Sequence, residues 1–290
     1  VASSYTLYKQ LLPKKLPPGI KNLLVIPDGK LGTLPFEALI SKKANKNTQD
    51  FQLLPYLLRK YAVSYNYSAS LAFESFKSQP TSTTKPSILL VAPVTFGEQM
   101  AELPGTEKEV QQISSLFAKG GLTYKTLLRK NASESILKSQ DLKRFQYLHF
   151  ATHGMVNAES PELSQIYFSS DSLKKEDGSL FAGEIYNLQV SAALVANSAC
   201  QTGLGKVAKG EGLIGLSRAW LYAGASNLLV SLWSASDVAT EILMGDFYSL
   251  SLENKKVGFS KALQSSKLKM LADKDFNKPV YWAAFILIGK

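Results

Sequence analysis

The sequence predicts an α/β protein with a mostly parallel sheet and helices on both of its faces. Near-continuous apolar runs occupy residues 87–93, 147–152, 193–199 and 227–233. Runs without in-and-out alternation are typical of strands that are buried on both faces. Segments with helical spacing separate these runs, and strands that alternate with helices form parallel sheets. With 290 residues, 45% of them hydrophobic, the chain can bury a sizeable core.

The first third of the chain contains two strand-like runs. NLLVIPDG (22–29) is apolar until Pro, Asp and Gly end it, which predicts a buried strand followed by a turn. LPFEALI (34–40) predicts the start of a helix, and the polar residues 41–50 predict a loop. LLRKYAVSYNYS (57–68) ends in an alternating pattern that predicts a second strand.

A polar segment then divides the chain. KSQPTSTTKP (77–86) is nearly free of apolar residues and predicts a linker or long loop. We therefore divide the chain into an N-terminal part, residues 1–80, and a larger part, residues 87–290. The N-terminal part has no His and no Cys, so it cannot carry a His–Cys dyad.

The larger part alternates strands with helices. TEKEVQQISSLF (106–117) has the spacing of one helix face, and Thr106 with Glu109 fits a capping box at its start. The polar segments 157–179 and 201–210 predict loops. The other elements that we expect are a strand at 124–130, a short helix at 133–139, helices at 210–225 and within 237–271, and a last strand at 281–289.

Composition excludes several classes of protein. No run of 18 apolar residues occurs, so we expect no membrane span. One cysteine cannot form an internal disulfide, and the chain starts without a secretory signal, so we expect a reducing, cytoplasmic location. Since it also starts without Met, we expect a piece of a longer chain.

The basic residues that give the chain its formal net charge of +10 do not cluster in the sequence. Nucleic-acid-binding proteins gather basic residues on one stripe with aromatic residues between them, whereas the lysine pairs here are dispersed. We therefore interpret the charge as a contribution to solubility, with an acidic partner surface as the alternative and direct binding of nucleic acid as the least favoured reading.

Two residues that could take part in catalysis, a histidine and a cysteine, follow neighbouring apolar runs. His153 follows YLHFAT, and Cys200, the only cysteine, ends ANSAC. Sites in parallel α/β sheets collect at the carboxyl ends of strands, so the two side chains are candidates for a catalytic dyad. The backbone N–H groups of Gly154 and Cys200 are candidates for an oxyanion hole. The alternative is a buried packing cysteine and a hydrogen-bonded histidine.

We expect neither a metal nor another cofactor. His149 and His153 lie four residues apart on a strand, about 13 Å, which is too far to share one ion. We interpret His149 as a core residue. No further His or Cys is present to complete a zinc site.

Six segments in order resemble the CHAT family, caspase-like domains that are often attached to tetratricopeptide repeats. They are LLVIPDGKLGTLPFEALI, LPGTEKEV, YLHFATHG, ANSACQTGLG, GEGLIGLSRAWLYAGASNLLVSLWSASD and YWAAFILIG. The resemblance implies a caspase-like three-layer sandwich, related to caspases, separases and gingipain-type proteases, and cysteine endopeptidase chemistry acting on a protein or peptide substrate. It makes His153 the base and acid and Cys200 the nucleophile. The caspase pattern Q-A-C-x-G is not kept, since Ser198 stands in the place of Gln and Thr202 in the place of Gly.

The resemblance also implies a bacterial protein, regulated by repeat domains in the full-length chain, whose N-terminal part extends the sheet or forms a reduced pseudo-protease lobe. Asp237 lies four residues beyond Trp233, as in separases, which would favour a basic P1 side chain. The alternative is that Asp237 caps a helix starting near Val238. A catalytically silent interaction or signalling module with the same fold is the alternative function.

Overall fold

The computed structural model describes residues 2–44, 50–77, 85–96, 100–157, 159–170, 175–198, 212–253 and 257–290. Its strands are Asn22–Val25 (β1), Ala62–Tyr65 (β2), Ser87–Ala92 (β3), Thr123–Leu128 (β4), Tyr147–Phe150 (β5), Gly154–Met155 (β6), Gln165–Tyr167 (β7), Ser179–Phe181 (β8), Leu194–Asn197 (β9), Leu228–Ser231 (β10) and Phe285–Ile288 (β11). Its α-helices are Ala2–Leu11 (α1), Ala69–Lys77 (α2), Pro104–Lys119 (α3), Glu134–Lys138 (α4), Ala182–Ile185 (α5), Gly212–Ala223 (α6), Asp237–Glu253 (α7), Phe259–Ala272 (α8) and Pro279–Trp282 (α9).

Eight strands form one mixed sheet in the order β1-β2-β11-β10-β9-β5-β3-β4. Neighbouring strands are parallel except for β10 and β11, which are antiparallel. The sheet therefore consists of two parallel blocks that run in opposite directions, β1-β2-β11 and β10-β9-β5-β3-β4. This arrangement confirms the predicted α/β class with a mostly parallel sheet.

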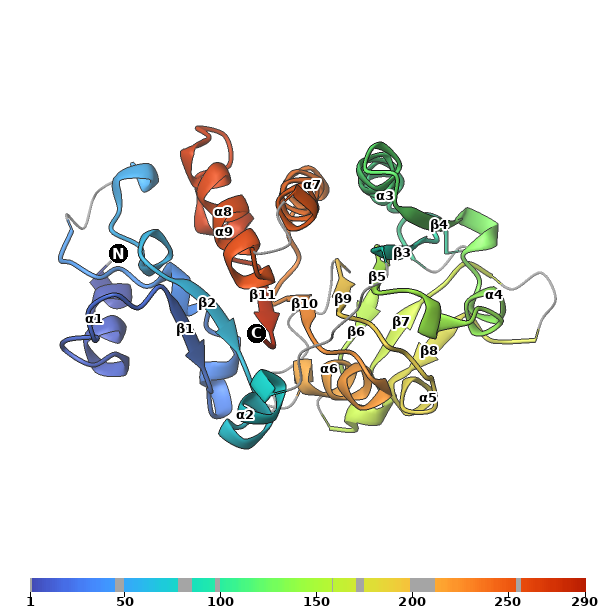
Figure 1. The fold of residues 1–290 in the computed structure, drawn as a ribbon, viewed down its shortest axis with the longest axis horizontal. Helices are drawn as coiled ribbons and strands as arrows, with labels where there is room; N and C mark the ends of the chain where they lie inside the picture. Colours follow the sequence, from blue (N-terminus) through green and yellow to red (C-terminus); the bar gives the residue numbers. More distant parts are fainter. Residues whose placement is uncertain are drawn as a thin grey trace.

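Helices cover both faces of the sheet (Figure 1). The core on one face contains side chains from α3, α7 and α8, including Phe117, Phe247 and Leu263. The core on the other face contains side chains from α4, α5 and α6, including Trp220, and α1 packs at its margin. Residues of the inner strands are buried in succession, as the apolar runs predict, because each face of the sheet meets a helical layer.

The N-terminal strands belong to the same sheet as the larger part, because β2 pairs with β11 at Tyr65 and Ile288. The division of the chain into domains stays a prediction, and most of the expected linker, residues 78–84, lies outside the described residues. LPFEALI forms a 3₁₀ turn at Phe36–Ala38 and not an α-helix, so that expectation was wrong. The reason is tertiary, since this turn places the Glu37 side chain inside the protein.

Glu37 is part of a buried network between both ends of the chain. Nζ of Lys267 donates to Oε1 of Glu37 and to the carbonyl oxygen of Phe285, at 2.5 Å each. The Tyr65 hydroxyl donates to Oε2 of Glu37 at 2.5 Å and accepts from the backbone N–H of Phe36 at 2.8 Å. Burial lowers the pKa of Lys267, and Glu37 opposes this shift. Burial, together with the Glu37 carboxylate, raises the pKa of Tyr65 well above its ordinary value.

Part of the segment that we expected to be a loop forms a second sheet. Strands β6, β7 and β8 pair in this order as an antiparallel sheet. The expectation of a loop over the whole of 157–179 was therefore wrong. Each strand has only two or three residues, too few for a periodic pattern.

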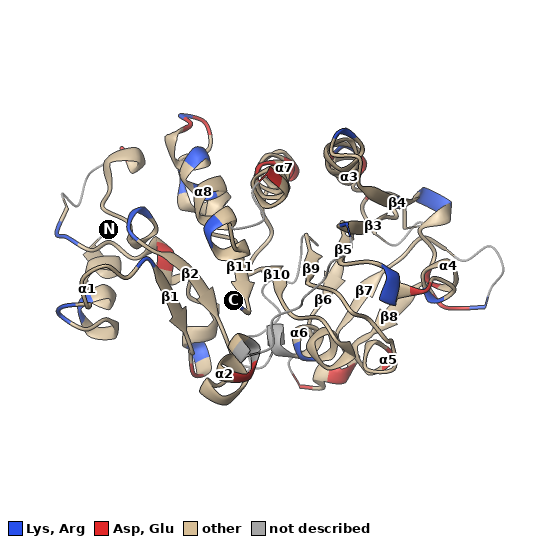
Figure 2. Ribbon diagram, viewed as in Figure 1, with Lys and Arg blue, Asp and Glu red and all other residues tan. Residues whose placement is uncertain are grey.

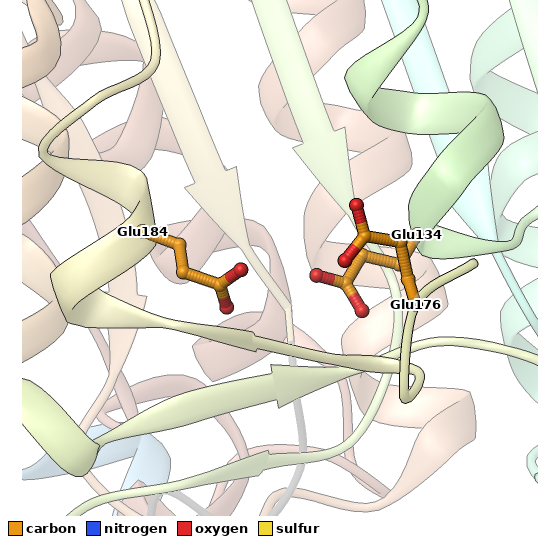
Figure 3. Close-up of side chains that lie close together, drawn as sticks. All are labelled: Glu134, Glu176 and Glu184. Atoms are coloured by element: carbon orange, nitrogen blue, oxygen red, sulfur yellow. The ribbon is translucent and has the colours of Figure 1, made fainter.

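The acidic side chains Glu134, Glu176 and Glu184 converge beside this small sheet, as Figure 3 shows. Three convergent carboxylates could hold a metal ion, but here Nζ of Lys138 lies between them, 2.7 to 3.0 Å from each. Burial lowers the pKa of Lys138, but its hydrogen bonds to the three carboxylates outweigh this and leave the pKa raised. The Lys138 ammonium group therefore occupies the position at which these carboxylates could hold a metal ion.

Candidate active site

His153 lies where sites of parallel sheets are expected. Strand β3 has β4 on one side and β5 on the other, so the loops that follow β3 and β5 leave the sheet in different directions. Such a switch point creates a crevice at the carboxyl ends of the strands. His153 follows β5 by three residues at this edge of the sheet, and only 7% of its surface is exposed.

The loop after β3 holds the imidazole. Nε2 of His153 lies 2.7 Å from the carbonyl oxygen of Ala101, and the ring centroid lies 4.6 Å from that of Phe96. Since a carbonyl oxygen only accepts, Nε2 carries a proton, and Nδ1 is the basic nitrogen of the neutral ring. Sequence reasoning missed both partners, because a backbone oxygen leaves no motif and Phe96 lies in an irregular loop.

This loop contains a strained residue. Val94 has a φ of 65°, in the left-handed region that β-branched residues avoid. Its carbonyl oxygen accepts from the N–H of Leu103 at 2.8 Å, which closes the loop ahead of α3. Strained backbone of this kind collects at functional sites.

The backbone of His153 is fixed from the opposite side by β7. The Thr152 hydroxyl donates to the carbonyl oxygen of Tyr167, and the N–H of Tyr167 donates to the carbonyl oxygen of His153 at 2.9 Å. Gly154 then starts β6 and pairs with Ile166. The proposed role of Gly154 in an oxyanion hole stays a prediction.

Cys200 lies outside the described residues, but the strand that leads to it is described. Strands β5 and β9 are parallel neighbours in which Phe150 pairs with Asn197. The N–H of Ser198 still donates to the carbonyl oxygen of Phe150 at 3.0 Å. His153 and Cys200 therefore each follow this paired position by three residues along the chain.

A buried polar network lies beneath this edge of the sheet. Oε1 of Glu109 lies 2.9 Å from Nε2 of His149, a distance at which a protonated imidazole would form an ion pair with the carboxylate. Nδ1 of His149 lies 3.2 Å from the Tyr248 hydroxyl, and Nε2 lies 3.5 Å from Oγ of Ser198. The network thus links α3 and α7 to a residue that stands two places before Cys200.

The predicted capping box was wrong. Helix α3 begins at Pro104, and its N-cap residue Leu103 makes no side-chain hydrogen bond. The Thr106 hydroxyl lies inside the first turn and donates to the carbonyl oxygen of Leu103 at 2.6 Å. Glu109 is therefore free to face His149, a role that the sequence did not reveal.

Asp237 is the first residue of α7, and it contacts the first turn of α3. A Cβ atom built at Gly105 would lie 2.6 Å from Cβ of Asp237, so only glycine allows this approach. Ser236 is the N-cap residue of α7, because its hydroxyl accepts a hydrogen bond from the N–H of Ala239 at 3.3 Å. The alternative reading of Asp237 as the N-cap was therefore wrong.

A small hollow next to Asp237 extends toward Ser198. Its volume of about 10 Å³ has room for no more than one water molecule, and its lining includes Gly105, Glu109 and Thr240. The Thr240 hydroxyl is buried without a hydrogen-bond partner among the described residues. The structure thus brings Asp237 and Ser198 to one hollow.

The fold defines a class of protein, the α/β sandwiches of caspase-like architecture. Gingipain R, described as an Arg-specific cysteine proteinase, is similar over 100% of this chain and 66% of its own, with a TM-score of 0.58 and 9% identity. The separase of the Saccharomyces cerevisiae separase–securin complex is similar over 89% of this chain and 15% of its own, with a TM-score of 0.50 and 13% identity. At such identities the likeness concerns the fold alone.

The chain belongs to the CHAT domain family, whose model matches residues 1–290. Among curated proteins, Homo sapiens tetratricopeptide repeat protein 28 is 25% identical over 310 residues, which cover 93% of this chain and 12% of the relative. The Mus musculus protein of the same name is 28% identical over 223 residues, 64% of this chain and 8% of the relative. The chain thus spans about a tenth of the curated relatives that it matches.

None of the helices in the described ranges is long and apolar enough to cross a membrane.

Proposed function

We propose that the protein is a cysteine endopeptidase in which His153 is the general base and acid and Cys200 the nucleophile. The observation that carries the proposal is the register of β5 and β9, in which Phe150 pairs with Asn197 and each candidate follows its strand by three residues. Neighbouring strands lie about 5 Å apart, so this register supports contact between the two side chains. The caspase-like fold supports the same chemistry.

The orientation of His153 suggests how each proton moves. With Nε2 donating to Ala101, Nδ1 accepts the proton of the Cys200 thiol, and the thiolate attacks the carbonyl carbon of the peptide bond. The backbone N–H groups of Gly154 and Cys200 would donate to the oxyanion. The imidazolium then protonates the leaving amine, and a water molecule deprotonated by His153 hydrolyses the thioester.

We assign Asp237 to recognition of a basic P1 side chain. Asp237 is half-buried and lines the same hollow as Ser198, which stands two residues before Cys200. A half-buried carboxylate favours a cationic partner, and a guanidinium can bind it with two parallel hydrogen bonds. The hollow itself holds no more than one water molecule, so a basic P1 side chain would have to reach Asp237 from outside it.

Cleavage of a fluorogenic peptide library varied at P1 tests the proposal. We expect wild type to cleave, and Cys200→Ala and His153→Ala to lose cleavage by at least a thousandfold with unchanged melting temperatures. Asp237→Asn should reduce cleavage after Arg and Lys without abolishing cleavage elsewhere. Full cleavage by Cys200→Ala would overturn the dyad, and an unchanged P1 preference in Asp237→Asn would overturn only the assignment of specificity.

A silent interaction module is the second candidate function. Two curated relatives carry the name of a tetratricopeptide repeat protein, and this chain covers only 12% and 8% of their lengths. The domain could therefore act through repeat domains in a longer chain. Slow alkylation of Cys200 by iodoacetamide, with the pH dependence of an ordinary thiol and no cleavage, would favour this candidate. Fast alkylation that depends on His153 would favour the peptidase.

A further inference from the structure

A broad hollow lies at the edge of the sheet opposite to His153. Its volume is about 1670 Å³, and its floor contains residues at the amino ends of strands, Ser87 of β3, Thr123 of β4 and Tyr147 of β5. Parallel strands bring their amino ends to one edge and their carboxyl ends to the other. Strand β5 runs from Tyr147 to Phe150, and at about 3.3 Å per residue its length of about 10 Å separates this hollow from the edge at which His153 lies. The hollow is thus distinct from the candidate active site.

Basic side chains surround this hollow. They are Lys85, Lys119, Lys125, Lys143, Arg144 and Lys290, and the acidic side chains in the lining are Asp141 and Glu253. Figure 2 shows Lys and Arg spread over many elements of the chain, and the sequence likewise suggests dispersed charge. The fold brings basic residues that are far apart in the sequence to one concave surface.

Most of these positive charges are not neutralised by an acidic side chain in the part of the chain that the structure describes. Among the described residues, Lys85, Lys119, Lys143 and Arg144 are exposed and form no ion pair with an acidic side chain. Nζ of Lys125 donates to Oε1 of Gln140 at 2.5 Å, and this amide oxygen carries no net charge. A concave surface lined by one sign of charge concentrates counter-ions of the opposite sign.

We propose that this hollow binds a compact polyanion that carries several phosphate groups. Arginine and lysine are the usual protein ligands of phosphate, and one phosphate occupies only two or three such side chains. Six basic residues around one hollow therefore fit several linked phosphates. The volume exceeds the roughly 300–1,000 Å³ of common small-molecule pockets, which leaves room for a group attached to the phosphates.

The shape of the surface favours a compact ligand over a long nucleic acid. Nucleic-acid-binding proteins carry an extended stripe of basic residues with interleaved aromatics, whereas these basic residues surround one cavity. Tyr124, 45% exposed, lines the same hollow and offers a ring on which a nucleoside base could stack. The ligand is thus free polyphosphate or the polyphosphate of a nucleotide.

Titration calorimetry of the whole chain with sodium tripolyphosphate tests the proposal. The variant Lys143→Glu with Arg144→Glu reverses two exposed charges in the hollow. The matched control Lys42→Glu with Lys43→Glu makes the same change in net charge at exposed residues outside it. We expect binding at low salt that weakens at least tenfold in the first variant and less than twofold in the control, with unchanged melting temperatures.

Comparison with adenosine triphosphate distinguishes the two sources of phosphate. Tighter binding of the nucleotide, with the excess lost in Tyr124→Ala, would assign the hollow to a nucleotide, and equal binding would assign it to free polyphosphate. Equal weakening by both double variants, or no binding of tripolyphosphate by wild type at low salt, would overturn the proposal. Tighter binding of a poly-glutamate peptide or a single-stranded oligonucleotide would also overturn it, in favour of a macromolecular partner.

Discussion

Nε2 of His153 lies 2.7 Å from the carbonyl oxygen of Ala101, so a backbone group of the loop after β3 determines the tautomer of the catalytic candidate. Phe96 of the same loop packs against the imidazole ring. The two contacts hold the ring with Nδ1 as the nitrogen that can accept a proton. Positioning of this kind contributes to catalysis, because a displacement of about 1 Å can cost a hundredfold in rate.

Replacement of Phe96 should affect the chemistry more than binding. We expect Phe96→Ala to lower kcat about tenfold and to change KM less than twofold, because the ring of His153 loses its packing partner. The alkylation rate of Cys200 against pH provides a readout that does not need a substrate, and its midpoint should move toward that of a free thiol. Phe96→Leu, which keeps apolar contact, should retain most of the activity. An unchanged alkylation profile in Phe96→Ala would show that Phe96 does not position His153.

Replacement of Gly105 should separate the first turns of α3 and α7. In Gly105→Ala the new methyl group would lie 2.6 Å from Cβ of Asp237, so one of the two helices must shift. We expect a loss of about 1–3 kcal/mol in the free energy of unfolding, as for other overpacked sites, and weaker cleavage after basic residues. Urea unfolding measures the stability. Gly32→Ala is the matched control, because no atom beyond its neighbours along the chain lies within 4 Å of its Cβ position. Equal stability of the two variants would contradict the prediction.

Removal of the Lys267 ammonium should strongly destabilise the fold. Lys267→Met leaves the buried Glu37 carboxylate without its cation, which costs about 3–5 kcal/mol in buried pairs of this kind. The double variant Lys267→Met with Glu37→Gln removes both charges and should recover more than half of the loss. Chemical unfolding of wild type, Lys267→Met, Glu37→Gln and the double variant completes the double-mutant cycle. A double variant less stable than Lys267→Met would contradict the prediction.

The same pair should make stability depend on pH. Since burial lowers the pKa of Lys267 in the folded protein, the unfolded chain binds more protons between this pKa and the ordinary value of 10.5. The Lys267 contribution to the free energy of unfolding therefore rises with pH across this window, and it disappears in Lys267→Met. The free energy of unfolding of wild type and of Lys267→Met is measured at several alkaline pH values. The difference between the two proteins isolates the Lys267 contribution.

Removal of Lys138 should convert its acidic cluster into a cation site. In Lys138→Met the carboxylates of Glu134, Glu176 and Glu184, whose oxygens lie within 4.8 Å of one another, repel each other without the ammonium. Because Lys138 is partly exposed, we expect a moderate loss of about 1–3 kcal/mol. Calcium at millimolar concentration should restore part of the melting temperature in the variant and leave wild type unchanged. Equal calcium effects on both proteins would contradict this.

The sequence was sufficient to predict the structure where the physical signal is local and repeated along the chain. The apolar runs that became β3, β5, β9 and β10 predicted a parallel sheet, because strands buried on both faces cannot alternate. The same runs placed His153 and Cys200 after neighbouring strands. Predictions failed where the signal was short or non-local, as for the 3₁₀ turn at Glu37, whose conformation serves a partner 230 residues away in the chain.

The sequence by itself determined the family, the α/β class and the identity of the candidate dyad, since these depend on residue types and on their order. Only the tertiary structure decided which groups surround His153, which residue caps α7 and which basic side chains meet at one hollow. The loops after β3 and β5 meet because these two strands are neighbours in the sheet. Ser236 caps α7 because the helix begins one residue earlier than expected. Lysines that are far apart in the chain converge because parallel strands start at one edge of the sheet. Contacts between distant segments follow from packing and topology, which the spacing of residues along the chain does not record.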